Sequence, residues 1–381
     1  MAKHIAVFCD GTWNSSDAAE PTNVVKLAQA VVLTPARGPV QQVIYVPGVG
    51  TGRGSTGLAR WLDRLAGGAF GLGLNLTLEE AYRALVFAHE PGDRIFLFGF
   101  SRGAYMARSL AGLLRASGLP PRQNLAGIRR ALARYRSPAP STRPDRTESF
   151  AFRLGFAPEL HTSQEEHDWR VCEGHPPGVK LQIAYVGVWD TVGTLGVPGH
   201  YGWLARMTNG AFEFHDTDLS SLVQAARHAV AVDELRRSFA PALWENLDGL
   251  NARRGGAPQY LQLWFPGVHG AVGGGGDRTE LSDRALRWIA DGAAAQGLRF
   301  RDEALPPAGV LPPPDAPLRN RSAPPSAFER VLALTATNRC GPKQRAEVAP
   351  GTADRWTRNP GYRPRTLDRV SQALTAEAGA G

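Results

Sequence analysis

The sequence predicts an α/β protein with a mostly parallel central sheet and helices on both of its faces. Short apolar runs alternate with helix-compatible segments from the N-terminus to about residue 115, and apolar runs return after residue 180. Parallel strands are joined by crossover connections that are usually helices, so this alternation favours a parallel sheet. Between 117 and 179, prolines and charged residues interrupt the pattern, which predicts an inserted lid or cap.

Two strands and two helices are expected before residue 90: strands at 4–9 and 42–46, and helices at 21–32 and 75–89. Residues 47–54 are rich in glycine but lack the lysine of a phosphate-binding loop, so we interpret them as a loop over the mouth of the site. The Asp-Gly-Thr run at 10–12 is typical of phosphatases of the haloacid dehalogenase type. Phe8 stands where their nucleophilic aspartate would be, which disfavours that mechanism.

The most informative stretch is an apolar run that ends in a Gly-x-Ser-x-Gly pattern centred on Ser101. A strand expected over 94–98 and a helix expected over 104–115 flank the serine, which is the strand–turn–helix context of a nucleophile elbow. Gly99 and Gly103 leave room where strand and helix nearly touch. This context predicts Ser101 as a catalytic nucleophile. The alternative is an ordinary turn flanked by glycines.

A candidate acid and a candidate base follow Ser101 along the chain. A strand over 181–189 ends at Asp190, and a strand over 260–265 is followed by His269 and a run of glycines. The order serine, acid, histidine, with the acid after a strand, is typical of the α/β-hydrolase fold. We therefore predict the triad Ser101, Asp190 and His269. The alternatives are an Asp190 that caps a turn and a His269 with a structural role.

His228 is a rival for the role of base. It lies within 219–232, a segment whose pattern predicts a helix. Because a triad histidine is delivered by a loop beyond a strand, His269 is the preferred candidate. A further helix is expected over 281–295, after the loop that carries His269.

An α/β-hydrolase holds the oxyanion of its reaction with two backbone N–H groups. One comes from the residue after the nucleophile and the other from a loop that follows an early strand. Arg102 supplies the first in this sequence, and Gly11 or Thr12 is the candidate for the second. The competing interpretation of this loop is a turn held by the side chains of Asp10 and Asn14.

Apolar and aromatic residues gather over 195–215 without strong periodicity. Trp203, Met207 and Phe212 are candidates to line an apolar acyl pocket, and ordinary core packing explains them about as well. Three units are expected along the chain: a catalytic domain over 1–300, a proline-rich arm packed on it over 301–370 with a short helical candidate near 326–335, and a disordered tail over 371–381.

The composition limits the classes of partner and cofactor. Among the 381 residues, 43 Lys and Arg stand against 35 Asp and Glu, for a net charge of +8. A basic surface suits phospholipid headgroups and equally reflects an arginine-rich composition. The basic residues are dispersed without an aromatic-basic module, so no nucleic-acid partner is predicted. The three cysteines lie far apart along the chain, and the spacing of His161, His167 and His175 fits no single helix face. We therefore predict neither a metal site nor a cofactor.

Membrane and export signals are not evident in the sequence. No apolar run reaches the roughly 18–20 residues needed to span a bilayer. The N-terminal segment also lacks the apolar core and cleavage site of a signal peptide. We therefore expect a soluble product made in the cytoplasm, which a non-classical route exports if it acts elsewhere.

Seven sequence blocks carry a family likeness: residues 8–14, 47–51, 99–105, 187–193, 228–234, 264–269 and 361–365. These blocks resemble the uncharacterised α/β-hydrolase family that includes the type VI secretion phospholipase effectors of the first lipase class. The resemblance implies that Ser101, Asp190 and His269 are nucleophile, acid and base. It also implies a membrane phospholipid or another lipid ester as substrate, a type VI export route, and a secretion-spike or immunity protein as partner.

The sequence thus predicts a serine hydrolase that cleaves carboxylic esters, a lipase or phospholipase in contact with a membrane surface. A soluble small-ester esterase or acyltransferase of the same fold is the second hypothesis. A non-catalytic binding protein with a hydrolase fold is the third. The presence of all three triad residue types argues against that third hypothesis.

Overall fold

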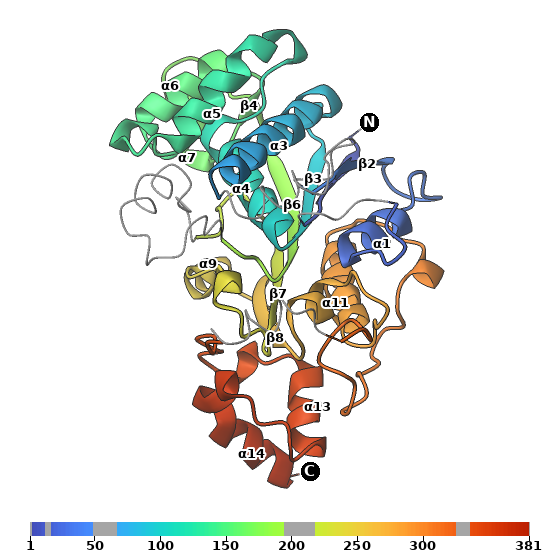
Figure 1. Ribbon diagram of the computed structural model, residues 1–381. Helices are drawn as coiled ribbons and strands as arrows, with labels where there is room; N and C mark the ends of the chain where they lie inside the picture. Colours follow the sequence, from blue (N-terminus) through green and yellow to red (C-terminus); the bar gives the residue numbers. More distant parts are fainter. Residues whose placement is uncertain (1, 12–16, 49–66, 194–217, 325–335, 381) are drawn as a thin grey trace.

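A computed structural model of the chain describes residues 2–11, 17–48, 67–193, 218–324 and 336–380 (Figure 1). Its centre is a sheet of six strands in the order β2-β1-β3-β6-β7-β8, whose neighbours pair in parallel. The strands are β1 (His4–Cys9), β2 (Gln41–Val46), β3 (Arg94–Phe100), β6 (Gln182–Trp189), β7 (Ala226–Ala231) and β8 (Tyr260–Phe265). The predicted α/β class with a mostly parallel sheet is therefore confirmed.

Helices cover both faces of this sheet (Figure 1). Side chains of β1 point alternately to the two faces, so Ile5 and Val7 pack with α3 and α4, whereas Ala6 and Phe8 pack with α1 and α11. No helix in the described part of the chain is long and apolar enough to cross a membrane. The helices are α1 (Asn23–Ala30), α3 (Gly67–Ala88), α4 (Arg102–Ser117), α5 (Ile128–Arg136), α6 (Thr147–Phe156), α7 (Gln164–Cys172), α9 (Leu247–Arg254), α10 (His269–Gly273), α11 (Ser282–Ala295), α13 (Pro350–Arg358) and α14 (Ser371–Ala380).

One predicted helix is wrong. The segment 219–232 contains strand β7 rather than a helix, and its neighbours in the sheet are β6 and β8. Alanines favour a helix locally, but Ala229, Val230 and Ala231 are fully buried between the two layers of the fold. Burial in the centre of a parallel sheet therefore overrides the local preference of this segment. His228 accordingly lies on a strand.

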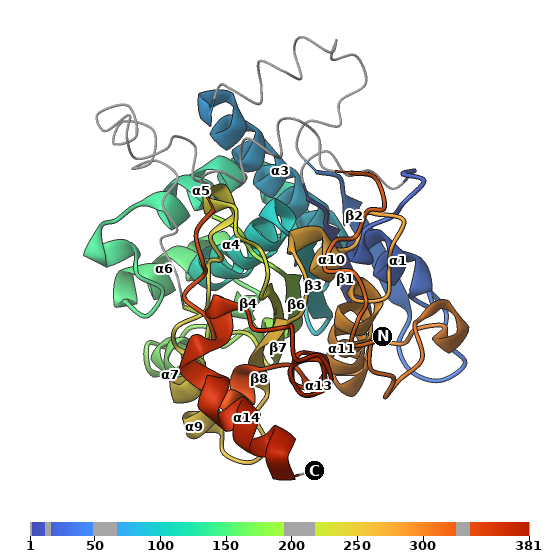
Figure 2. The same cartoon turned by 60° about the horizontal axis from the view of Figure 1, so that its bottom comes forward.

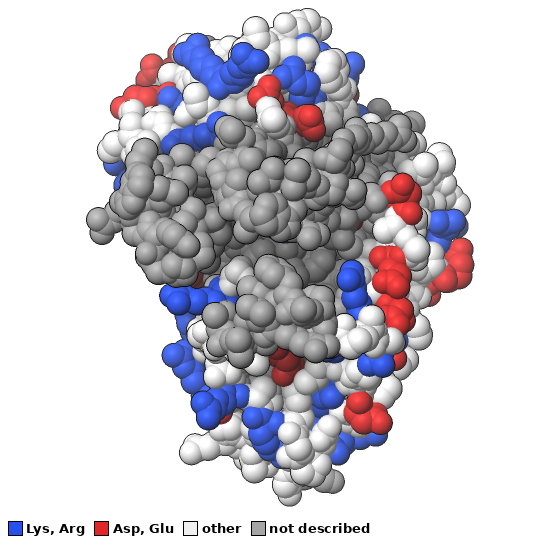
Figure 3. Space-filling view, viewed as in Figure 1, with Lys and Arg blue, Asp and Glu red and all other residues white. Residues whose placement is uncertain are grey.

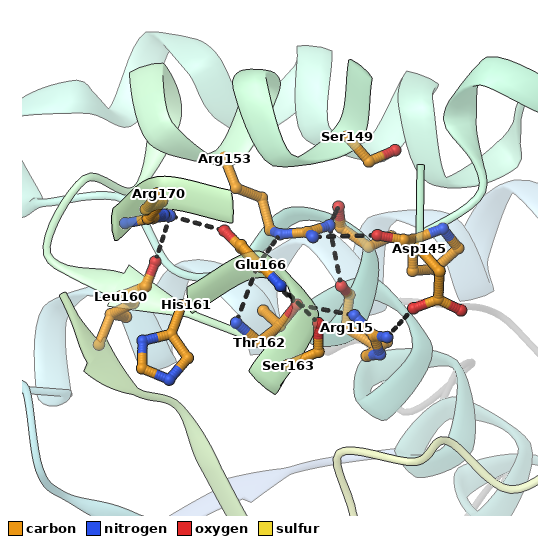
Figure 4. Close-up of polar contacts among 12 residues, drawn as sticks. Arg115, Asp145, Ser149, Arg153, Leu160, His161, Thr162, Ser163, Glu166 and Arg170 are labelled. Carbon is orange, nitrogen blue, oxygen red and sulfur yellow. Dashed lines mark hydrogen bonds and ion pairs between the residues drawn. The ribbon is translucent and has the colours of Figure 1, made fainter. Parts of the chain in front are cut away.

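Residues 117–179 form a helical unit at one end of the molecule, with helices α5, α6 and α7 and a short parallel ladder of β4 (Leu160–His161) and β5 (Val179–Lys180) (Figure 1). A buried ionic cluster joins this unit to the end of α4. The carboxylate of Glu166 pairs with Arg153 at 2.7 Å and with Arg170 at 2.6 Å, and none of these side chains is exposed (Figure 4). Arg153 also donates to the carbonyl of Ala116 at the C-terminal end of α4, at 3.1 Å.

The histidines of this unit differ in their surroundings. His161 is buried in β4, where its Nδ1 lies 3.0 Å from the carbonyl oxygen of Pro177. His175 is exposed. Within the described ranges, no group of three or more His, Cys, Asp or Glu side chains is arranged to hold a metal ion.

The C-terminal arm packs against the β7–β8 side of the sheet, where α13 and α14 lie beside β8 (Figure 2). The predicted disordered tail 371–381 is a second correction, because Ser371–Ala380 form helix α14 and Leu374 is buried. Leu374 joins an apolar cluster with Trp264 of β8 and Trp356 of α13, and this contact orders the tail. The helical candidate near 326–335 lies outside the described residues.

Charged side chains lie in several groups over the surface of the molecule. On the face seen in Figure 3, Lys and Arg side chains lie over the helical unit at the top and along the lower left, and acidic side chains gather on the right. The described part of this face therefore carries its positive charge in separate groups rather than in one continuous patch.

Candidate active site

The site begins at Ser101, in the turn between β3 and α4. Ser101 has φ 58° and ψ −120°, a backbone conformation that residues other than glycine rarely adopt. Such a conformation costs on the order of 1–3 kcal/mol and persists only where the surrounding structure enforces it. The N–H of Ser101 donates to the carbonyl of Trp189, at the end of β6, at 3.0 Å. The serine therefore stands at the strand–turn–helix junction that the sequence predicts.

Two glycines allow this turn to close. A Cβ at Gly99 would lie 2.3 Å from the carbonyl oxygen of Gly103, and a Cβ at Gly103 would lie 2.1 Å from the carbonyl oxygen of Cys9. Real Cβ atoms do not approach other atoms so closely, so neither position accepts a side chain without a shift of the backbone. The expectation that these glycines leave room between strand and helix is confirmed.

Asp190 and His269 come together at the same edge of the sheet. Because the strands are parallel, the segments that follow β3, β6 and β8 meet at their carboxyl ends. Nδ1 of His269 lies 2.6 Å from Oδ2 of Asp190, and the other oxygen of Asp190 accepts the N–H of Ala231 at 2.9 Å. Asp190 is fully buried and His269 is 7% exposed.

The imidazole of His269 is held between two phenyl rings. Its centroid lies 4.6 Å from that of Phe100 and 4.8 Å from that of Phe239. Phe100 is the residue directly before Ser101, so this contact places the histidine ring beside the serine turn. A buried carboxylate, an imidazole and a strained serine therefore share one small region of the molecule.

His228, the rival base, faces a different set of partners. Its Nε2 accepts the backbone N–H of Thr191 at 3.1 Å, and its Nδ1 lies 2.9 Å from Oε1 of Gln262. Burial, together with the positive charge of Arg108, lowers the pKa of His228 to about 3. His228 is therefore a neutral structural residue with both ring nitrogens engaged.

A family model described as "T6SS, Phospholipase effector Tle1-like, catalytic domain" matches residues 3–292. The chain belongs to this family. The resemblance read from the sequence blocks is thereby confirmed. The three residues Ser101, Asp190 and His269 all lie within the matched part of the chain.

Similar proteins are longer than this chain. The uncharacterized protein YEL023C of Saccharomyces cerevisiae is 27% identical over 248 residues, which cover 62% of this chain and 32% of that protein. An uncharacterized protein from Pseudomonas aeruginosa, known from a crystal structure, has 20% identity and a TM-score of 0.40, with 81% of this chain and 48% of that chain covered. The structure of the Tle1 effector bound to the VgrG spike of the type VI secretion system has 16% identity and a TM-score of 0.37, with 72% and 51% covered. The chain spans about a third of the yeast protein and about half of each solved chain.

The oxyanion candidates of this Tle1-like domain have distinct surroundings. Arg102 begins α4, so its backbone N–H belongs to the positive end of the helix dipole. The N–H of Gly11 donates to the carboxylate of its neighbour Asp10 at 2.7 Å, and Thr22 donates to the same carboxylate. Gly11 thus takes part in a turn held by Asp10. Thr12 lies outside the described residues.

The candidates for the acyl pocket, Trp203, Met207 and Phe212, also lie outside the described residues. So does most of the glycine-rich loop 47–54. The described part of the Tle1-like domain therefore includes the candidate residues Ser101, Asp190 and His269, and the acyl pocket remains an expectation from the sequence.

Arg339 is a residue of the site that sequence reasoning missed. Its guanidinium donates to both carboxylate oxygens of Asp190, at 2.6 and 2.9 Å, and its side chain is 3% exposed. It also donates to the carbonyls of Ala231 at 2.9 Å and Phe239 at 2.7 Å. Arg339 lies beyond residue 292, in the arm, where the sequence shows one arginine among many and offers no signal for this role.

Asp190 and His269 have shifted pKa values. Burial by itself raises the pKa of Asp190, but the charge of Arg339 and the hydrogen bond from His269 outweigh burial and hold that pKa below its usual range. Burial also lowers the pKa of His269, although Asp190 acts in the opposite direction. Both shifts favour an ionised acid and a neutral imidazole at neutral pH.

Glu234 is a second residue that the analysis of the sequence did not assign. Its carboxylate accepts the backbone N–H of His269 at 3.2 Å and pairs with Arg236 at 2.7 Å. Glu234 is therefore placed to fix the backbone from which the imidazole projects. The available signal was its position in the block 228–234, which the resemblance already includes.

Proposed function

We propose that this chain is a serine hydrolase of the α/β-hydrolase fold that cleaves the carboxylic esters of phospholipids. The observation that carries the proposal is the 2.6 Å hydrogen bond between His269 and Asp190, next to the strained turn that presents Ser101. Membership of the Tle1-like phospholipase effector family supports the lipid substrate.

The proposed reaction begins at the serine. Since Nδ1 of His269 is bound to Asp190, Nε2 is left to take the proton of Ser101 as the serine oxygen attacks the ester carbonyl. Asp190 holds the imidazole in that tautomer and stabilises the imidazolium that forms. The N–H of Arg102 binds the oxyanion together with a second N–H, for which Thr12 stays the candidate because the N–H of Gly11 already donates to Asp10.

The second half of the reaction releases the products. His269 returns its proton to the leaving alcohol, which departs and leaves the acyl chain on Ser101. A water molecule, activated by His269, then attacks the acyl-enzyme and frees the fatty acid. Both halves need the same acid, base and oxyanion donors, so removal of Ser101 is expected to stop the whole cycle.

A secretion-spike partner is part of this proposal. The Tle1 effector whose structure is known is bound to the VgrG spike, and this chain shares its family. We therefore propose export by the type VI route and contact with an anionic membrane surface, with an immunity protein as a further partner. Co-purification of this chain with a spike protein tests the route.

The decisive experiment compares the wild type with Ser101→Ala on phosphatidylglycerol vesicles and on short-chain nitrophenyl esters. We expect the wild type to release fatty acid from the vesicles and Ser101→Ala to lose this activity while its thermal unfolding stays close to that of the wild type. Ser109→Ala, a buried serine of α4, is the matched control and is expected to keep the activity.

The outcomes separate the competing functions. Full activity of Ser101→Ala would refute the mechanism. Hydrolysis of the nitrophenyl ester alone would favour the small-ester enzyme. If a fluorophosphonate probe fails to label Ser101 and neither ester is cleaved, the chain is a binding protein with a hydrolase fold.

A further inference from the structure

The C-terminal arm delivers one charged group into the site. Arg339 reaches Asp190 from outside the matched domain, which ends at residue 292. The two terminal nitrogens of its guanidinium, Nη1 and Nη2, each donate to a different oxygen of Asp190, at 2.6 and 2.9 Å. This parallel pair of hydrogen bonds fixes the plane of the carboxylate as well as its charge.

The backbone around Arg339 is held in place on both sides. Ala336 pairs with Arg236 in an antiparallel bridge, and the N–H of Thr337 donates to the carbonyl of Leu235 at 2.8 Å. Further along, the arm packs Trp356 and Leu374 against the sheet. The segment that carries Arg339 is therefore hydrogen-bonded to the residues that follow β7.

We propose that Arg339 is a positioning residue of the active site, which keeps Asp190 ionised and oriented toward His269. The arm then completes the site rather than only covering the sheet. This inference rests on the proposed function, because it assigns Asp190 and His269 the roles of acid and base.

The physical argument starts from burial. Asp190 is fully buried, and a carboxylate in such a place takes up a proton readily unless a cation or several donors stabilise its charge. A protonated Asp190 would lose the negative charge that stabilises the imidazolium, and a rotated Asp190 would lose the hydrogen bond from Nδ1–H of His269 that holds the imidazole in its reactive tautomer. Arg339 supplies the cation, and its fork of donors leaves one lone pair of Oδ2 directed at His269.

Other charged and titratable groups also lie near the pair of Asp190 and His269: Glu234, Arg236, His228 and Arg108. Glu234 and Arg236 pair with each other at 2.7 Å, and His228 is neutral with both ring nitrogens engaged. Among the described residues, Arg339 is the cation that forms an ion pair with Asp190. Removal of Arg339 therefore leaves the negative charge of Asp190 without its cation.

The test is the variant Arg339→Met, in which the side chain keeps most of its length and loses its charge. With the cation gone, the pair of Asp190 and His269 takes up its first proton at higher pH. We expect the midpoint of the acid limb of kcat/KM to rise by about one pH unit or more. We also expect kcat to fall roughly 10- to 1,000-fold with KM little changed, less than the roughly 10⁴-fold loss when a triad acid fails.

A second measurement needs no substrate. NMR titration of ring-labelled histidine, with the His269 signal assigned through His269→Gln, reports the proton uptake of the pair directly. This signal is expected to titrate at higher pH in Arg339→Met than in the wild type. Failure of the proposed function appears as an active Ser101→Ala variant or an inactive wild type, whereas failure of this inference appears as an unshifted His269 titration.

Two further variants keep the inference testable. Arg339→Lys retains the positive charge but cannot donate to both carboxylate oxygens in parallel. We expect this variant to fold even if Arg339→Met does not. The midpoint of its acid limb is expected to lie closer to the wild-type value than its kcat does. Arg355→Met removes another buried arginine of the arm, which donates to the carbonyl of Ala316 instead of to Asp190, and it is expected to leave the His269 titration unchanged. An equal shift in Arg355→Met, or no shift in a folded Arg339→Met, overturns the inference.

Discussion

His228 and Thr191 are joined by a hydrogen bond in which the imidazole is the acceptor: Nε2 lies 3.1 Å from the backbone nitrogen of the residue directly after Asp190. This bond separates the two candidate bases. His228 binds the backbone N–H of Thr191, whereas His269 contacts the carboxylate of Asp190 itself.

The first prediction compares these two histidines. His269→Gln is expected to reduce kcat/KM at least about 10³-fold, because no other imidazole contacts Asp190 among the described residues. His228→Leu is expected to keep kcat/KM within about tenfold and to lower the free energy of unfolding by about 1–3 kcal/mol, since the N–H of Thr191 loses its buried acceptor. Kinetics and urea unfolding of both variants check this, and the reverse pattern would make His228 the base.

The second prediction concerns the crowded turn at Gly103. Gly103→Ala places a Cβ 2.1 Å from the carbonyl oxygen of Cys9, which is backbone and cannot rotate away. We expect a loss of more than about 3 kcal/mol in the free energy of unfolding, or no folded product. Gly249→Ala is the matched control, because this glycine is helical, exposed and has no atom within 4 Å of its Cβ position. Alanine at this position is expected to raise the free energy of unfolding by about 0.5–1 kcal/mol. Similar unfolding of both variants contradicts the close contact.

The third prediction concerns the buried ionic cluster of the helical unit. Glu166→Gln leaves Arg153 and Arg170 without a countercharge in a place where neither is exposed (Figure 4). We expect the free energy of unfolding to fall by about 3–5 kcal/mol. Glu165→Gln changes the exposed neighbour in the same helix and is expected to stay within about 0.5 kcal/mol of the wild type. Equal effects of the two changes in urea unfolding would show that the cluster does not hold the unit on α4.

The fourth prediction is the pH dependence of the reaction. His269, the proposed base, can accept a proton only when it is neutral, so activity is expected to rise as pH rises through its pKa. Burial lowers that pKa, and the acid limb of kcat/KM is therefore expected to have its midpoint below about 6.5, the ordinary value for histidine. A pH–rate profile with a midpoint at or above 6.5 is inconsistent with the buried imidazole described above.

The fifth prediction is the pH dependence of stability at His89, which is remote from the triad. Burial lowers the pKa of His89 to about 4. Between pH 6.5 and about 4 the unfolded chain binds a proton at this position that the folded chain does not. His89 therefore contributes a loss of stability of about 1.4 kcal/mol per unit of falling pH. His89→Gln is expected to reduce the slope of unfolding free energy against pH in this window by that amount, and an unchanged slope contradicts it.

Local pattern was sufficient for most elements of the fold. Strands before Ser101, Asp190 and His269 were expected from short apolar runs, and all three exist. The pattern failed at 219–232, where an alanine-rich segment has the local character of a helix and becomes the strand β7. It failed again at 371–380, where Leu374 alone gives too weak a signal to predict a packed helix.

The sequence by itself determined most of the elements, the glycines that allow the serine turn, and the family, because each of these depends on neighbouring residues or on blocks that can be read in order. Only the tertiary structure decided that Arg339 meets Asp190, 149 positions away along the chain. It also decided that His228 contacts Thr191 while His269 contacts Asp190. The physical reason is the same in both cases: the pairing of buried charges and hydrogen bonds depends on which strand ends the fold brings to one edge of the sheet, and spacing along the chain does not encode it.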